Sequence, residues 1–300
     1  MASSTSNTVI DTTNKITRAS YVMGVHRWVA ASFGLLNVGH HKFVDISLDQ
    51  QDPTNILLQS MGITLLAISA IIHSAISFSP TERMSVCQCL VLTFAVEGFI
   101  CLRELITPTL RSVAGIVVVD DRLVVITLLG IFAVICAAYS WASLDFFPAS
   151  IPTTPQSRWT SLSVLIALNA VISISIGMLS VFYPEETFYE YPKMMDPRLN
   201  TLAPNAKELI VIRCWGGFIL GIGAMCTKVP WFDPKHQTIF GIIMLFQYIA
   251  LTVLYASDWD QLNTIYQYGS IPVFGTYILL YVAALTTSGV AIQKRNDKED

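Results

Sequence analysis

Two glutamates in one apolar run are the residues best placed to do chemistry. Glu97 stands in the middle of LTFAVEGFICL, and Glu104 follows seven residues later. On a helix they share one face, about 10 Å apart along the axis. A charged group in hydrocarbon costs at least about 2.5 kcal/mol, so it marks a cavity or a partner. Two readings stay open: a structural Glu97 bonded to another helix through Arg213, or an acid that keeps its proton where water is scarce and can deliver it.

A third carboxylate stands among aromatic residues. Asp258 lies in YASDWDQL between Tyr255 and Trp259. Aromatic faces attract positive charge, so this segment suits the handling of a cation, although it also fits a solvated helix end. Arg213 and Trp215 precede two glycines, a spacing that lets helices approach closely. Helix packing is therefore the alternative to substrate binding for that pair.

Other motifs that carry chemistry are missing from the sequence. The adjacent His40 and His41 have no third ligand nearby, so we predict no metal site. The six cysteines all lie in apolar runs and read as small hydrophobic residues. No phosphate-binding loop, HExxH or GxSxG pattern occurs. We therefore expect no cofactor.

The composition fixes the class of protein. Of the 300 residues, 53% are hydrophobic and 13% are charged, about half the charge of a soluble domain. The apolar residues form runs of roughly 20, the length that crosses a bilayer as a helix. The net charge of −3 offers no basic surface to nucleic acid. The chain is thus expected to be an all-α integral membrane protein whose surroundings are the lipid bilayer.

The apolar runs predict about eight transmembrane helices. The first contains His26 and Arg27 and is the least apolar of them, so a count of seven is the alternative. A polar tail is expected over residues 1–20, a linker over 145–159 and a second tail over 294–300. The predicted spans are 21–39, 56–78, 84–106, 122–144, 160–183, 208–228, 237–256 and 271–293.

The distribution of charge predicts the orientation. With eight spans, both termini share one face with three of the loops, and this face carries nine Lys and Arg residues against six on the other. The positive-inside rule then places both termini in the cytoplasm. We expect a multi-pass protein of the endoplasmic reticulum.

The two halves of the chain resemble each other. Residues 61–80 align without a gap on residues 215–234, so that Gly62 meets Gly216. The same offset of 154 pairs Glu104 with Asp258. Units of four spans each, 21–144 and 160–293, predict a parallel 4+4 repeat, whose axis runs along the membrane normal.

Eight spans, acidic residues in both halves among Trp and Tyr, and the lack of a cofactor motif resemble one known group. These are the fungal membrane-bound terpene cyclases of the ascochlorin and ascofuranone type. The resemblance implies an isomerase that protonates an epoxidised prenyl chain and cyclises it in meroterpenoid biosynthesis. It makes Glu97 or Glu104 the acid and Asp258 the counter-ion. Further residues would bind the lipophilic substrate or its cation, namely Arg213, Trp215, Tyr255 and Trp259.

Two other functions fit the same residues. A proton-coupled small-molecule transporter could use Glu97 as its proton carrier within a parallel repeat. A structural or assembly subunit of a membrane complex would need no site. Transporters usually carry helices broken by Gly or Pro at corresponding positions of the two halves. Here the prolines lie in loops or at span ends, which argues against transport.

Overall fold

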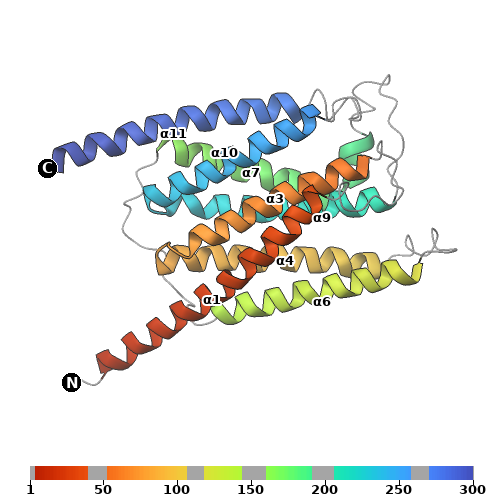
Figure 1. Ribbon diagram of the computed structural model, residues 1–300, viewed down its shortest axis with the longest axis horizontal. Coiled ribbons are helices and arrows are strands. Elements are labelled where there is room, and N and C mark those ends of the chain that lie inside the picture. The colour runs from red at the N-terminus through yellow and green to blue at the C-terminus, as the bar shows by residue number, and fades with distance from the viewer. Residues whose placement is uncertain are drawn as a thin grey trace.

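The structure, a computed structural model, describes residues 4–39, 53–106, 118–143, 160–190, 206–257 and 270–299. These residues form eight long α-helices and no strand, and the helices run side by side in one bundle (Figure 1). Two short helices, η2 (Glu186–Glu190) and η3 (Val229–Trp231), complete the described part. The long helices are α1 (Ser4–Val38), α3 (Pro53–Ala75), α4 (Pro80–Ile106), α6 (Val118–Ser143), α7 (Ser161–Phe182), α9 (Ala206–Lys228), α10 (Pro234–Ser257) and α11 (Ile271–Glu299).

Seven of these helices are long and apolar enough to cross a membrane. The prediction of an all-α, multi-pass membrane protein is therefore confirmed. The crossing segments are Ile56–Ala75, Pro80–Ile106, Val125–Ser143, Ser161–Phe182, Glu208–Trp231, Pro234–Ser257 and Ile271–Ser288.

α1 is the helix that falls short of this criterion, because His26 and Arg27 interrupt its apolar run. It nevertheless follows α3 along its length: a Cβ added at Gly34 would meet the carbonyl oxygen of Gly62, and Arg27 contacts His73 two turns further along α1. α1 begins at Ser4, whereas the sequence suggests a tail over residues 1–20. α1 thus spans the depth of the bundle as its eighth helix.

The helices form equivalent neighbour pairs in the two halves of the chain. α1 lies against α3 and α4 against α6, as α7 lies against α9 and α10 against α11. Between the halves, α4 packs on α9 and α10 packs on α3, while α3 and α9 contact each other.

The start of α7 is fixed by a capping box between Thr160 and Ser163.

One close helix crossing in each half of the chain, α1 with α3 and α7 with α9, is built on a pair of glycines. A Cβ added at Gly62 would lie 2.7 Å from the carbonyl oxygen of Gly34, and one added at Gly177 would lie 2.8 Å from that of Gly216. Small residues are needed where two membrane helices approach this closely. The sequence alignment pairs Gly62 with Gly216, which lie at these two crossings. The complete 4+4 repeat stays a prediction, but the crossings recur where it requires them.

The two tight turns at one end of the bundle are built alike. Pro80 begins α4 and Pro234 begins α10, each at the first helical position, where a missing N–H costs little. Arg83 and Gln237 each donate two hydrogen bonds to carbonyl groups five and seven residues earlier, at 2.7 to 3.1 Å. Gln237 lies 154 positions after Arg83, which is the offset of the predicted repeat. In the second turn a neutral side chain, Gln237, therefore makes the hydrogen bonds that Arg83 makes in the first.

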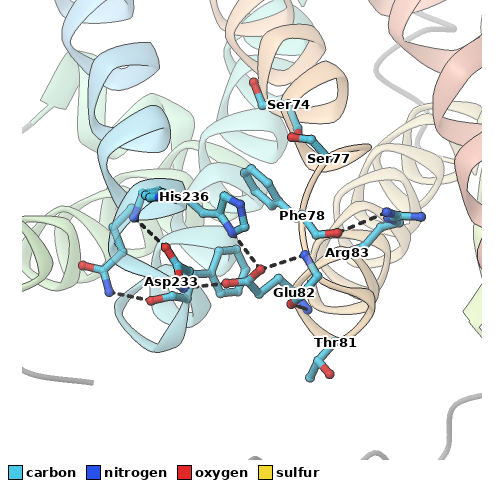
Figure 2. Close-up of polar contacts among 12 residues, drawn as sticks. Ser74, Ser77, Phe78, Thr81, Glu82, Arg83, Asp233 and His236 are labelled. Atoms are coloured by element: carbon cyan, nitrogen blue, oxygen red, sulfur yellow. Dashed lines mark hydrogen bonds and ion pairs between the residues drawn. The ribbon is translucent and has the colours of Figure 1, made fainter. Parts of the chain in front are cut away.

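Glu82 joins these two turns (Figure 2). Its Oε2 accepts hydrogen bonds from the backbone N–H of Ser79 at 3.0 Å and from Nδ1 of His236 at 2.8 Å. Its Oε1 accepts from the backbone N–H of Asp233 at 2.6 Å. Backbone N–H groups at helix starts lack partners within the helix. One buried carboxylate therefore caps α4 and α10 together and links the two halves.

Candidate functional site

The candidate site lies where α4 of the first half meets α9 of the second. We call this contact the α4/α9 interface and define it by Thr93, Glu97, Glu104, Arg213, Gly217 and Gly221. α4 places Glu97 in mid-span and leaves it fully buried, with 0% of its surface exposed. A Cβ added at Gly217 would collide with Oε1 of Glu97, and one added at Gly221 would collide with Thr93. The glycines of α9 thus provide the space that the polar side chains of α4 occupy.

Glu97 is a solitary carboxyl group. Neither of its oxygens has a hydrogen-bond partner of good geometry among the described residues. The polar group that faces it is the Cys214 thiol, which is a weak donor. Ile100 contributes an apolar wall beside Gly217. A buried polar group without partners costs roughly 1–3 kcal/mol, so Glu97 weakens the bundle that contains it.

Glu104 has a different environment two turns along α4. Its Oε1 accepts a hydrogen bond from Nη1 of Arg213 at 2.8 Å, and both side chains are largely buried. The sequence left open a hydrogen bond between Arg213 and Glu97. In the structure Arg213 binds Glu104 instead. The reason is the antiparallel course of α4 and α9, which sets residue 213 beside residue 104 and residue 217 beside residue 97. The ion pair neutralises Glu104, while Glu97 faces the uncharged Cys214 thiol.

The other predicted site residues lie elsewhere or outside the described part. Trp215 is buried on α9. Tyr255 is buried on α10, where it accepts a hydrogen bond from Ser60 at 3.2 Å and meets Phe274 edge-on. Tyr255 therefore belongs to the contact of α10 with α3. Asp258 and Trp259 lie outside the described residues.

The contact of α10 with α3 serves as an internal reference for Glu97. Leu251 stands 154 positions after Glu97, and Ile63 stands 154 positions before Gly217. Both are buried in one apolar cluster that includes Tyr255. At the position that the predicted repeat pairs with Glu97, the fold thus accepts Leu251 in one apolar cluster with Ile63. A carboxyl group at residue 97 is not needed to hold such helices together.

A polar and aromatic cluster in the second half escaped the sequence analysis. Asn169 on α7 accepts a hydrogen bond from the Tyr248 hydroxyl at 2.6 Å and donates one to the Tyr281 hydroxyl at 3.3 Å. The Tyr277 ring stacks on the Tyr248 ring, with 4.8 Å between the ring centroids. The available signal was an Asn in an otherwise apolar run and two tyrosines one helical turn apart. The first half has a simpler counterpart, in which His26 is bonded to the Tyr139 hydroxyl at 2.7 Å.

Within the described residues, no group of three His, Cys, Asp or Glu side chains could hold a metal ion. The α4/α9 interface offers a buried acid, Glu97, beside the Arg213–Glu104 ion pair. Comparisons with protein-family profiles, curated proteins and solved structures give no match for this chain.

Proposed function

We propose that the protein is an integral-membrane isomerase in which Glu97 is the general acid for a lipophilic substrate. The observation that carries the proposal is the burial of Glu97 away from other charges: it is fully buried opposite a glycine, and the group that faces it is the weakly polar Cys214 thiol. In hydrocarbon the neutral form of a carboxyl group is much less costly than the anion. Such a group carries a proton that an apolar substrate can receive.

The reaction that fits best is the cyclisation of an epoxidised prenyl chain, as the resemblance to membrane-bound terpene cyclases implies. Glu97 gives its proton to the epoxide oxygen, and the carbon–oxygen bond breaks to leave a carbocation. A double bond of the chain attacks this cation and closes the ring. Loss of a proton from carbon returns one to the carboxylate, so the product is an isomer of the substrate and no cofactor is consumed.

In this proposal the remaining predicted residues support the cation. As the resemblance implies, Trp215 and Trp259 would stabilise positive charge through their ring faces and Asp258 would act as its counter-ion, whereas Tyr255 belongs to the contact of α10 with α3. The Arg213–Glu104 ion pair would hold α4 against α9 beside the acid. We place the enzyme in the endoplasmic reticulum with both termini in the cytoplasm, following the distribution of basic residues.

The test is product formation in membranes that contain the protein, supplied with epoxidised farnesylated phenols and with free epoxidised prenyl alcohols. The expected product is a cyclised isomer of unchanged mass. Glu97→Gln keeps the shape, removes the proton and should reduce turnover about 10²- to 10⁴-fold. The matched control is Gln247→Glu, which adds a buried carboxyl group to α10 instead and should not restore activity to Glu97→Gln.

Proton-coupled transport is the second candidate. It is favoured by the position of Glu97 between the two halves, because parallel-repeat transporters bind substrate and protons there. Substrate-dependent proton uptake by proteoliposomes, with no isomer formed from any substrate of the panel, would replace the enzyme proposal with this one.

A further inference from the structure

A basic pair lies at the contact of α1 with α3, outside the α4/α9 interface. Nη1 of Arg27 on α1 and Nδ1 of His73 on α3 are 2.7 Å apart. The guanidinium can only donate, so Nδ1 of His73 is the acceptor and its proton is on Nε2. The pair therefore offers an N–H of His73 and the remaining N–H groups of Arg27 to a third partner.

Arg27 has no acidic partner in the described part of the molecule. α3 contains no Asp or Glu at all. On α4, Glu82 is bonded to the two turns and Glu104 to Arg213, while Glu97 faces α9. Nε of Arg27 is buried and has no hydrogen-bond partner among the described residues. The positive charge of Arg27 is therefore uncompensated by this part of the protein.

The surroundings of the pair are those of a membrane-facing surface. Tyr21 and Trp28 on α1 are 74% and 67% exposed, Val25 is 51% exposed, and the Arg27 guanidinium lies over the Trp28 ring at 5.4 Å. His73 is itself exposed. A ligand that reaches the pair must thus pass through hydrocarbon or bring acyl chains with it. A free aqueous anion does not meet that requirement.

A polar strip connects the pair with the nearer end of the bundle. Ser69 and His73 are four residues apart on α3, which places them on one face, and Ser77 lies in the turn that follows the helix. Ser69 donates a hydrogen bond to the carbonyl oxygen of Arg27 at 2.7 Å. Arg27 is seven residues, about 10 Å, from the level of Ser20 and the α3–α4 turn. A long side chain directed toward the headgroups shortens that distance.

We propose that Arg27 and His73 bind the phosphate of an anionic phospholipid between α1 and α3. The phosphate would accept hydrogen bonds from Nε2 of His73 and from Arg27, whose charge it would neutralise. Its acyl chains would lie along the apolar outer face of α1. The site is at the end of the bundle that the sequence assigns to the cytoplasm, where anionic lipids gather. The proposal does not depend on the function of Glu97.

The experiment is native mass spectrometry of the purified protein after reconstitution in phosphatidylcholine with one fifth phosphatidylglycerol. The wild type should retain phosphatidylglycerol in preference to phosphatidylcholine. Arg27→Gln should lower that preference about tenfold, the effect of losing one hydrogen bond to a charged group. The matched control is Arg83→Gln, because Gln237 makes the same contacts in the other turn. It removes a buried cation near the same end and should leave the preference unchanged.

Equal lipid retention by Arg27→Gln and the wild type overturns the proposal, and so does an equal loss in Arg83→Gln. Saturation of the site by inorganic phosphate in lipid-free micelles also overturns it in favour of a simple anion site. If Arg27→Gln does not insert, His73→Ala and Arg27→Lys decide the question. His73→Ala should weaken the preference, Arg27→Lys should keep most of it, and the reverse order contradicts the assignment.

Discussion

Replacing Glu97 by leucine places in the α4/α9 interface the residue type that the predicted repeat pairs with it, Leu251. Glu97→Leu removes a carboxyl group whose two oxygens lack partners, at a cost of roughly 1–3 kcal/mol in the wild type. The new side chain has about the same length and fills the space over Gly217. We therefore expect the free energy of unfolding to rise by about 1–3 kcal/mol, while activity is lost.

The measurement is equilibrium unfolding of the purified protein in mixed micelles, followed by circular dichroism, with turnover assayed on the same preparations. The matched control is Leu251→Gln, which brings a polar group into the apolar cluster of Ile63 and Tyr255. It should lower the free energy of unfolding by about 1–3 kcal/mol. Destabilisation of more than about 2 kcal/mol by Glu97→Leu would show that Glu97 has a structural partner and would refute the reasoning.

Three further groups of substitutions test the packing of the bundle. Glu104→Gln and Arg213→Gln should each lower the free energy of unfolding by about 3–5 kcal/mol, since each leaves a buried partner unpaired. The double variant should lose much less than the sum of the two. Additive losses in the double-mutant cycle would mean that the pair is not formed. Glu82→Ala removes the acceptor of three hydrogen bonds and should cost about 3 kcal/mol in the same unfolding assay, with Glu82→Gln recovering part of it. Gly216→Ala should cost about 1–3 kcal/mol because its Cβ meets α7, whereas Gly130→Ala, with open space around it, should be neutral; equal effects would contradict the crossing.

The class of fold was predictable from the sequence because bilayer thickness sets the length of an apolar helix. Each of the seven apolar crossing segments overlaps a predicted span. The first span was the difficult one, since Arg27 lowers its hydrophobicity and its contact with His73 could not be inferred from sequence spacing. The aligned glycines were informative for a similar reason: close crossings restrict side-chain size, so Gly62 and Gly216 leave a trace in the sequence.

The candidate site was only partly predictable. The burial of Glu97 follows from its place in mid-span, but its isolation does not, because the rotation and direction of α9 decide which carboxylate Arg213 reaches. The cluster of Asn169 with Tyr248 and Tyr281 depends on three helices from one half and left only a weak pattern. Contacts between helices that are distant in the sequence are thus the part that needed the structure.

The most direct test of the central claim is chemical labelling of Glu97 with a hydrophobic carbodiimide, which enters from the lipid and reacts with neutral carboxyl groups. Labelled protein is digested and the modified residue is located by mass spectrometry. Glu97 should be modified at neutral pH with loss of turnover, and excess substrate should slow the reaction. Glu104, bound to Arg213, and Glu82, which accepts three hydrogen bonds, should react far more slowly. Rapid labelling of Glu104 or Glu82 while Glu97 stays unmodified would contradict the assignment of Glu97 as the isolated acid.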